Sequence, residues 1–361
     1  MKILEVVQSL GSGGAERLVV DLCNELSKTE EVTLLLLKEA EHYYLPQVCE
    51  NVKIVKANIP VGFSFSQMWT CVNLIKEINP EVIHVHSHAR FNILLANLLL
   101  RNRYRFYMTI HSDVYLHYSK GISGLQVRLS GFIGKCKFIT ISETNYQQFS
   151  HCHPRLKQKK ILNGRALPSF SYKYTEVVEE MRKYKFNDNT KVFIHVARFH
   201  PCKNQQLLIN VFNKLIESGE NISLIIIGAN FDCEKGRQLQ TIAHENIHFL
   251  GTRTNVYDYL ACADAFCLSS DYEGMPMSFI EAMLSGLPMV STPVCGAFDV
   301  ITNGKNGFIS ESHSLEDYKY AIKSLLNQFD KVSSFAKTKK ENCPYTISSC
   351  AKEYIEWFSY I

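Results

Sequence analysis

The stretch "DAFCLSSDYEGMPMSFIEAMLSGLPMVST", residues 264–292, contains the pattern that decides the fold. Apolar runs at its start and at its end have the length of buried strands, and the segment between them repeats its apolar residues with helical spacing. Pro276 suits the start of a helix, and Gly286 with Pro288 would end it, which predicts a helix over residues 277–285. Strand, helix and strand in this order are typical of a parallel sheet covered by helices.

The same alternation continues along the first half of the chain, so the fold class is α/β with doubly wound sheets. Strands are predicted near KILEVV, VTLLLL, VKIVKA, EVIHVH, RFYMTI and KFITIS, and helices over residues 14–27, 66–78, 90–100 and 123–134. A polar interval from Asn163 to Thr190 follows, which is predicted to be poor in regular structure and to link two domains.

A second alternating series begins after this interval. Strands are predicted at KVFIHVAR, ISLIIIG, IHFLG, DAFCLSS, PMVST and NGFIS, with helices over residues 204–217, 255–262, 277–285, 297–302 and 315–327. The chain closes with a predicted helix in ISSCAKEYIEWFSYI.

Composition narrows the class of protein. With 361 residues, 46% of them hydrophobic, the chain can bury the cores of two domains. The apolar stretch at residues 93–100 is shorter than the ~20 residues of a membrane span, and the amino terminus has no signal-peptide cleavage pattern, so a cytoplasmic location is expected. The twelve cysteines form no CxxC pair, and most, such as Cys23 and Cys267, lie in apolar runs, which predicts buried free thiols.

Charge is distributed unevenly. Residues 1–165 carry 20 Lys and Arg against 13 Asp and Glu, a net charge of +7, whereas the remainder has a net charge of −3. The excess is concentrated between residues 101 and 137, where Asp113 is the only acidic residue. A solvated surface explains it, and so does an anionic membrane face or an acidic acceptor. No nucleic-acid partner is expected.

Ligands of open α/β sheets bind beyond the carboxyl ends of the strands, so the turns after the strands are the candidate site. "GSGGAER", Gly11–Arg17, follows the first strand, and its glycines would let backbone N–H groups approach a phosphate or sugar, although a plain tight turn fits equally well. It does not match the dinucleotide fingerprint, because Glu16 occupies the third glycine position.

Histidines mark two further strand ends. His84, His86 and His88 alternate in "HVHSHAR" and could share one face as metal ligands, but no fourth ligand is evident in the sequence. His111 in "TIHSD" ends another strand, where a structural histidine is the alternative to a site residue.

Two cations, Arg198 and Lys203, precede a helix in "HVARFHPCKN". Positive charge opposes the helix dipole at this end, which indicates that an anion sits between them, with ordinary surface charge as the alternative.

Glu273 and Glu281 are eight positions apart, with Glu273 in the loop before the predicted helix 277–285 and Glu281 in the middle of that helix. Eight positions correspond to ~12 Å along a helix, too far for the carboxylate pair of a retaining hydrolase at about 5 Å. The free amides of the helix start lie between them and suit phosphate. A nucleotide sugar has the matching layout, with hydroxyls at both ends for the glutamates and a diphosphate in the middle for Arg198 and Lys203.

Jointly these motifs resemble the GT-B retaining glycosyltransferases known as family 4, over nearly the whole chain. The resemblance is carried by the E-x7-E of Glu273 and Glu281, by "ARFHPCKN" and by "GSGGAER". It implies two Rossmann-like, doubly wound domains facing a central cleft. Residues 1–165 would bind the acceptor, with a helix at 345–361 packing back on them, and residues 166–344 would bind the nucleotide-sugar donor.

The family's contacts transfer to positions that match its motifs. The resemblance implies that Glu273 binds the donor sugar's hydroxyls, Glu281 the ribose, and Arg198 with Lys203 the diphosphate. The other implied contacts are His111 near the anomeric carbon, the glycine loop at Gly13 and Gly14, the backbone around Gly274, Met275, Pro276 and Met277, and the base contacts Thr252 and Arg253.

Two departures from the family pattern limit the transfer. "NGRAL", Asn163–Leu167, lacks the family's aspartate after the last strand of the first domain. "CGAFD" has Cys295 for the first glycine and Asp299 for the glutamate of the usual G-G-x-x-E.

The predicted activity is a retaining, hexosyltransferase-type transfer from a nucleotide-diphosphate sugar to a hydroxyl of a glycan or lipid-linked acceptor, in cell-surface polysaccharide synthesis. No cofactor or metal is expected, because no D-x-D occurs in the sequence. The alternatives are a GT-B nucleotide-sugar epimerase, a non-catalytic sugar-nucleotide-binding protein, and a metal hydrolase using His84, His86 and His88. Peripheral attachment to the inner face of the cell membrane is a further hypothesis from the basic first half.

Overall fold

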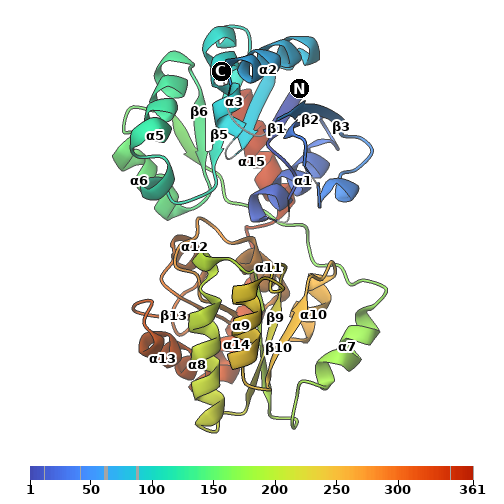
Figure 1. Ribbon diagram of the computed structural model, residues 1–361, viewed down its shortest axis with the longest axis vertical. Helices are drawn as coiled ribbons and strands as arrows, with labels where there is room; N and C mark the ends of the chain where they lie inside the picture. The colour runs from blue at the N-terminus through green and yellow to red at the C-terminus, as the bar shows by residue number, and fades with distance from the viewer. Residues whose placement is uncertain (12, 41, 61–63, 87–88, 342, 361) are drawn as a thin grey trace. The chain divides into compact units, whose positions relative to one another are not determined.

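The computed structural model describes residues 1–11, 13–40, 42–60, 64–86, 89–341 and 343–360 and divides the chain into two compact units (Figure 1). Unit 1 contains Met1–Ala166 and Pro344–Ile361, and unit 2 contains Leu167–Cys343. The boundaries expected from the sequence lie within one residue of these. His88, one of the three alternating histidines, lies outside the described residues.

Unit 1 is built on a seven-stranded parallel sheet in the order β3-β2-β1-β4-β5-β6-β7. Its strands are β1 (Lys2–Val7), β2 (Glu31–Lys38), β3 (Lys53–Ile59), β4 (Val82–His86), β5 (Arg105–Ile110), β6 (Lys137–Thr140) and β7 (Gln158–Lys160). Its helices are α1 (Gly14–Leu26), α2 (Phe65–Ile78), α3 (Arg90–Leu100), α4 (Val114–His117), α5 (Gly121–Arg128), α6 (Glu143–Cys152) and α15 (Ile347–Ser359), with a π-helical turn η3 (Leu129–Ile133) and a 3-10 turn η1 (Leu45–Gln47).

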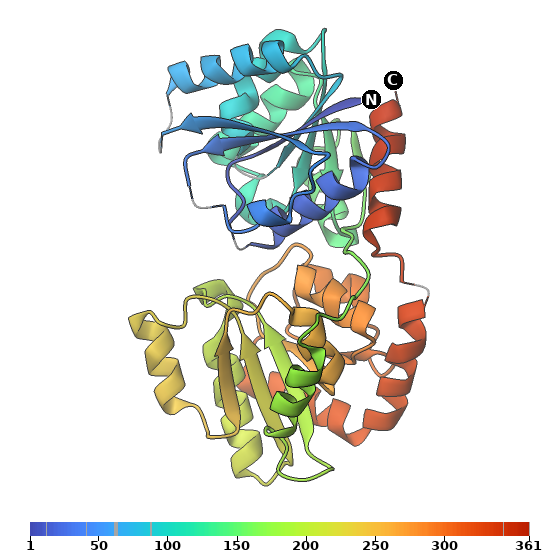
Figure 2. The same ribbon diagram turned by 90° about the vertical axis from the view of Figure 1, so that its right-hand side faces the viewer.

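The two faces of this sheet differ in chemistry. Leu4 and Val6 of β1 point to an apolar core that α2 and α3 complete. Residues of the opposite parity point to the other face, where Tyr354 and Phe358 of α15 pack against His84 of β4. Figure 2 shows α15, in red, running along unit 1. Because side chains alternate along a strand, each face has its own set of residues, and the polar ones gather under α15.

Unit 2 has a six-stranded parallel sheet in the order β10-β9-β8-β11-β12-β13. Its strands are β8 (Lys191–Val196), β9 (Ile222–Ile227), β10 (Ile247–Gly251), β11 (Ala265–Leu268), β12 (Met289–Ser291) and β13 (Gly307–Ile309). Its helices are α7 (Tyr174–Arg182), α8 (Gln205–Glu217), α9 (Glu234–Ile242), α10 (Val256–Cys262), α11 (Met277–Ser285), α12 (Cys295–Val300), α13 (Leu315–Asn327) and α14 (Phe329–Glu341), with a 3-10 turn η4 (Pro201–Lys203).

The α/β class and the predicted strands are confirmed, but the interval 163–190 was predicted wrongly. It contains α7, which buries only Val177 and Met181 and therefore has too narrow an apolar stripe to stand out in the sequence. The sequence also missed β7, α4, α6, α9 and α14, and it placed α12 two residues too late. These elements are short or polar.

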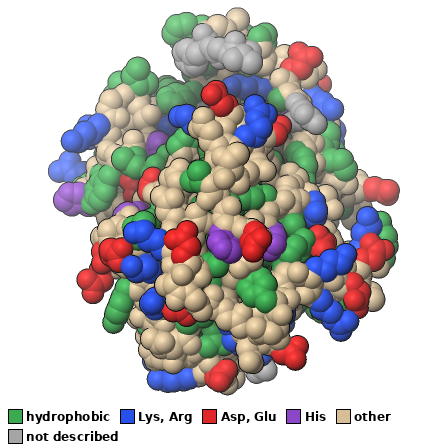
Figure 3. All heavy atoms as spheres, turned by 60° about the horizontal axis from the view of Figure 1, so that its bottom comes forward, with side chains coloured by type: hydrophobic (Ala, Val, Ile, Leu, Met, Phe, Trp, Pro, Cys, Tyr) green, Lys and Arg blue, Asp and Glu red, His purple; other side chains and the backbone are tan. Residues whose placement is uncertain are grey.

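None of the described helices combines the length and the apolar composition that a membrane span requires. All twelve cysteines are free, as predicted. Burial was predicted too broadly, because Cys23 and Cys267 are buried but Cys233 is exposed. On the face drawn in Figure 3, acidic and basic side chains are interspersed with apolar ones.

Candidate functional site

Three of the residues predicted for the donor follow two strands that lie side by side at the topological switch point of unit 2. β8 and β11 are neighbours in the sheet, although the chain forms β9 and β10 between them. Arg198 and Lys203 follow the carboxyl end of β8, and Glu273 follows that of β11. Doubly wound sheets bind ligands beyond such strand ends, so the sheet order itself brings the loop that carries the predicted cations beside the loop that carries the carboxylate.

Lys203 and Glu273 are in direct contact. Nζ of Lys203 forms an ion pair with Oε1 of Glu273, and the hydroxyl of Ser270 donates to the same oxygen at 2.7 Å. Side-chain exposure is 21% for Lys203 and 13% for Glu273. This partial burial makes the pair stronger than a surface ion pair, and it leaves both groups accessible to a ligand.

Backbone contacts between two loops hold this pair in place. The amide of Asp271 donates to the carbonyl of Cys202 at 2.8 Å, and the side-chain amide of Asn204 donates to Oδ1 of Asp271 at 2.7 Å. The hydroxyl of Ser269 donates to the carbonyl of Lys203 at 2.8 Å. The loop after β8 is therefore fastened to the loop after β11, which sets the position of Lys203 relative to Glu273.

The amino terminus of α11 lies directly after Glu273. Pro276 is its N-cap and its side chain makes no cap hydrogen bond, while the amide of Phe279 donates to the carbonyl of Pro276 at 3.1 Å. Gly274, Met275 and Met277 are buried around it. Uncapped amides and the helix dipole favour an anion at this end.

Glu281 lies on the second turn of α11 and is 9% exposed. It therefore belongs to the helix that begins at the candidate site.

A glycine of α12 fixes the backbone before α11. A Cβ on Gly296 would lie 2.7 Å from Cδ of Pro276 and 2.9 Å from Cα of Met275. Only glycine permits this close approach, so "CGAFD" supports the loop 274–276 by packing.

The structure constrains three other predicted residues less tightly than Lys203 and Glu273, namely Arg198, Thr252 and Arg253. Arg198 is exposed, with its carbonyl accepting from the side-chain amide of Gln205 at 3.0 Å. Thr252 and Arg253 follow β10, which β9 separates from β8, so the sheet does not place them beside Lys203 and Glu273. Nε of Arg253 donates to the hydroxyl of Tyr259 at 3.0 Å.

The corresponding switch point of unit 1 lies between β1 and β4. Gly13 is the N-cap of α1 and Gly14 its first residue, so backbone amides face the carboxyl end of β1 without a side-chain cap at Gly13. Ser12 of the same loop lies outside the described residues.

A buried cluster of polar side chains lies near the carboxyl ends of β4 and β5. Oε2 of Glu5 lies 2.6 Å from Nε2 of His86 and 2.8 Å from Nδ1 of His84. Nδ1 of His86 lies 2.9 Å from Nε2 of His111. No role was predicted for Glu5, although a carboxylate inside the apolar run KILEVV was the available signal.

Burial and mutual charge shift the pKa values of this cluster. Burial alone would raise the pKa of Glu5, but the charge and hydrogen bonds of His84 and His86 outweigh it and lower that pKa to about 2. Burial, assisted by His84 and opposed by Glu5, lowers the pKa of His86 to about 4. Burial, with His86 and His84, also lowers the pKa of His111 well below its usual value. At neutral pH these values correspond to an ionised Glu5 with neutral His86 and His111.

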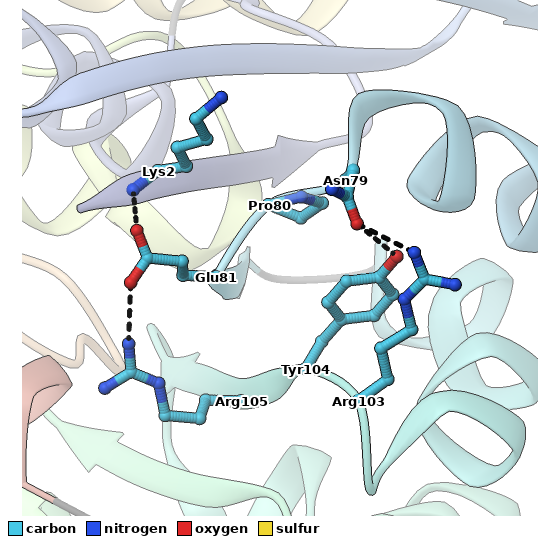
Figure 4. A pocket seen from close by; sticks show the side chains of 7 residues that line it. All are labelled: Lys2, Asn79, Pro80, Glu81, Arg103, Tyr104 and Arg105. Atoms are coloured by element: carbon cyan, nitrogen blue, oxygen red, sulfur yellow. Dashed lines mark hydrogen bonds and ion pairs between the residues drawn. The ribbon is translucent and has the colours of Figure 1, made fainter.

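A separate pocket of about 530 Å³ lies in unit 1 at the amino-terminal ends of the strands, opposite to the ends that carry the candidate site loops (Figure 4). Lys2, Glu81 and Arg105 line it at the starts of β1, β4 and β5. Glu81 accepts from the backbone amide of Lys2 at 3.0 Å and lies 3.5 Å from the guanidinium of Arg105. Because the ligand loops follow the carboxyl ends of the strands, this pocket is not part of the candidate site.

The chain matches two models of known protein families. The family described as Glycosyltransferase Family 4 matches residues 12–160, and the family described as Glycosyl transferases group 1 matches residues 177–342. The first match lies in unit 1 and the second in unit 2, so each unit has its own family signature.

Similar proteins belong to the same class. An uncharacterized glycosyltransferase of Methanocaldococcus jannaschii is 27% identical over 237 residues, which are 61% of this chain and 57% of that protein, so the chain spans less than two thirds of its length. The capsular polysaccharide biosynthesis glycosyltransferase CapH of Staphylococcus aureus is 27% identical over 296 residues, 78% of each chain. The crystal structure of HepE from Anabaena, in complex with UDP and glucose, has a TM-score of 0.81 at 19% identity over 100% of both chains, which shows the fold. The chain therefore belongs to the group 1 glycosyltransferases and has their GT-B fold.

Proposed function

We propose that this protein is a retaining glycosyltransferase that moves a sugar from a nucleotide-diphosphate sugar to a hydroxyl of a glycan or lipid-linked acceptor. The observation that carries the proposal is the Lys203–Glu273 ion pair beside the uncapped start of α11, at the switch point of unit 2. A cation, a carboxylate and free amides at one place match a diphosphate flanked by sugar hydroxyls. The similarity to CapH supports a place in cell-surface polysaccharide synthesis.

The residues divide the work as follows. Glu273 accepts hydrogen bonds from the sugar hydroxyls and Glu281 from the ribose, while Lys203 and Arg198 neutralise the diphosphate. Without a ligand, the ammonium group of Lys203 forms an ion pair with Glu273, and an incoming diphosphate competes with this carboxylate for the ammonium group. As the bond between the anomeric carbon and the diphosphate oxygen breaks, negative charge grows on that oxygen, and the two cations and the α11 amides stabilise it.

The acceptor hydroxyl attacks the anomeric carbon on the face from which the diphosphate departs. The departing phosphate oxygen takes the proton of that hydroxyl. Atoms and charges balance without a metal, because Lys203 and Arg198 are fixed cations. The chain has no D-x-D sequence. Unit 1 is proposed to bind the acceptor, and His111 to contact the donor sugar. The base contacts of Thr252 and Arg253 and the phosphate contacts of Gly13 and Gly14 remain part of this proposal.

A donor and acceptor screen tests the function. UDP-glucose, UDP-N-acetylglucosamine and GDP-mannose are incubated with alkyl glycosides of the same sugars, with and without EDTA, and the anomeric configuration of the product is measured by NMR. A product that retains the donor's configuration and forms in EDTA is expected. An inverted product contradicts the mechanism, a sharp loss with EDTA contradicts metal independence, and donor conversion without acceptor identifies an epimerase. Binding of a nucleotide sugar without any turnover identifies a binding protein.

The acceptor side has a surface that suits a membrane. Ile122 and Leu125 of α5 and Phe132 of η3 are exposed, Ile122 by 79%. Lys120 and Arg128 are exposed beside them in sequence. Apolar and basic side chains on one short helical segment are typical of attachment to an anionic leaflet. We therefore place the peripheral membrane contact on residues 120–133, which would bring unit 1 close to a lipid-linked acceptor.

A further inference from the structure

One face of the sheet in unit 1 has a continuous row of buried polar side chains. The row runs from Tyr354 of α15 through Thr109 and His84 to Glu5, and from there through His86 to His111. Oγ1 of Thr109 lies 3.1 Å from the hydroxyl of Tyr354 and 2.7 Å from Nε2 of His84. All of these side chains except that of His111 are fully buried, and His111, after the end of β5, is partly exposed.

The register of the strands produces this row. Glu5 of β1 is opposite His84 of β4, and His86 of β4 is opposite Thr109 of β5. All four point away from the apolar core that contains Leu4 and Val85. A buried row of this kind is costly to form unless its hydrogen bonds are mutually consistent, which limits where the protons can lie.

The carboxylate of Glu5 sets the direction of the bonds. An ionised carboxylate only accepts, so Nε2 of His86, at 2.6 Å, carries the proton and donates it. Nδ1 of the neutral His86 ring is then an acceptor, and Nε2 of His111, at 2.9 Å, donates to it. Nδ1 of His111 consequently has the lone pair.

We propose that Glu5 and His86 are positioning residues that hold His111 in the Nε2–H tautomer, so that its Nδ1 accepts a hydrogen bond from a hydroxyl of the sugar substrate. This inference rests on the proposed function, in which His111 contacts the donor sugar. Glu5 and His86 do not touch substrate and act through the orientation and tautomer of His111.

A metal ion is the competing interpretation of the same atoms. One donor atom each from Glu5, His84 and His86 lies within 4.8 Å of the others. Direct contact without a metal is favoured because one oxygen of Glu5 lies within 2.8 Å of a ring nitrogen of both imidazoles. The two interpretations predict opposite tautomers. A metal on Nε2 of His86 would leave the proton on its Nδ1, which would donate to Nε2 of His111 and place the His111 proton on Nδ1.

NMR of the full-length protein labelled with ¹⁵N-histidine separates these outcomes. Long-range ¹H–¹⁵N spectra report the tautomer of each ring, and the His111→Gln variant assigns the signals of His111. The Nε2–H tautomer is expected for His111, with no stoichiometric metal in the purified protein by mass spectrometry. An Nδ1–H tautomer, or one zinc per chain that is lost in Glu5→Gln, overturns the proposal.

Variants test whether the row serves His111. In Glu5→Gln the amide group can donate to His86, which reverses the direction of the bonds, so the Nδ1–H tautomer of His111 should become populated. Turnover of the fastest donor in the screen should fall about 10- to 100-fold, while its KM changes much less. Tyr354→Phe, which removes a buried hydroxyl at the far end of the row, is the matched control and should leave the tautomer and the turnover unchanged. Equal effects of both variants contradict a positioning role.

His86→Phe provides a second test if Glu5→Gln does not fold. It removes the acceptor of His111 and should give a mixture of both tautomers with reduced turnover. Failure of the proposed function has a different result. In that case the wild-type protein transfers sugar from none of the donors, although its His111 has the Nε2–H tautomer. Transfer by a protein with the other tautomer defeats this inference alone.

Discussion

Lys203 and Glu273, seventy positions apart in the sequence, form an ion pair where β8 and β11 end side by side. Hydrogen bonds between the two loops, from Asp271 to Cys202 and from Ser269 to Lys203, hold the pair together. The cation is thereby positioned before a ligand arrives, which reduces the reorganisation needed as charge develops on a leaving diphosphate.

Replacing Lys203 by alanine is expected to lower turnover roughly 10²-fold or more, because the leaving diphosphate loses a fixed cation and meets the unpaired carboxylate of Glu273. Initial rates at saturating donor and acceptor measure the effect. Lys214→Ala is the control, since Lys214 is an exposed lysine of α8 whose ion pair with Glu316 is at the surface. An unchanged rate in Lys203→Ala would refute the role of this residue.

The two glutamates are expected to differ in what they affect. Glu273→Gln should lower turnover about 10- to 100-fold, because a charged acceptor for the sugar hydroxyls is lost, and should leave binding of the free nucleoside diphosphate largely unchanged. Glu281→Gln should weaken binding of that nucleoside diphosphate about 10-fold through the ribose. Calorimetry with UDP and GDP measures both. If Glu273→Gln instead weakened binding of the nucleoside diphosphate and Glu281→Gln lowered turnover alone, the sugar and ribose contacts would have to be exchanged between the two glutamates.

Acid should destabilise unit 1 through its buried polar cluster. The pKa is about 2 for Glu5 and about 4 for His86, below their ordinary values of 4.5 and 6.5. The unfolded chain thus binds more protons between pH 6.5 and 2, so the free energy of unfolding falls as the pH is lowered through this range. Urea unfolding followed by the fluorescence of Trp69 and Trp357, both in unit 1, measures it.

In that experiment His86→Phe should reduce the pH dependence between pH 6.5 and 4, whereas Tyr354→Phe should preserve it. A wild-type stability that does not change between pH 6.5 and 4 would be incompatible with a buried neutral His86.

Membrane attachment is expected to depend on residues 120–133. The protein should float with vesicles that contain anionic lipid and remain behind with purely zwitterionic ones, since both apolar contact and charge contribute. Ile122→Ser with Leu125→Ser should abolish flotation. Phe298→Ser, which changes an exposed apolar residue of unit 2, should not. Equal flotation with both kinds of vesicle would count against the electrostatic contribution.

Much of the fold could be predicted because parallel strands are buried on both faces. Runs such as ISLIII, β9, and the helix limits at Pro276 and Gly286 are visible in the sequence for that reason. Helix α7 was missed because it buries only Val177 and Met181. Strand β7, Gln158–Lys160, has no apolar residue to reveal it.

The candidate site could be predicted only where a local pattern carries it. Glycine, proline and charge at strand ends identify the loops of Lys203 and Glu273, but the hydrogen bond from Asp271 to Cys202 joins residues far apart in the sequence. Glu5 contacts His84 and His86 only because the sheet order places β1 beside β4. Such contacts depend on tertiary structure, and no spacing within one segment encodes them.

The central claim, that the start of α11 and Lys203 bind the diphosphate of a nucleotide sugar, is tested most directly by thermal unfolding with a panel of UDP, GDP, ADP and dTDP. At a concentration of about 100 times Kd, binding adds about 2.7 kcal/mol to stability, which raises Tm measurably. At least one nucleoside diphosphate is expected to raise the Tm of the wild type and of Lys214→Ala, with the increase lost in Lys203→Ala. No increase with any of the four, or an equal increase in Lys203→Ala, would contradict the account.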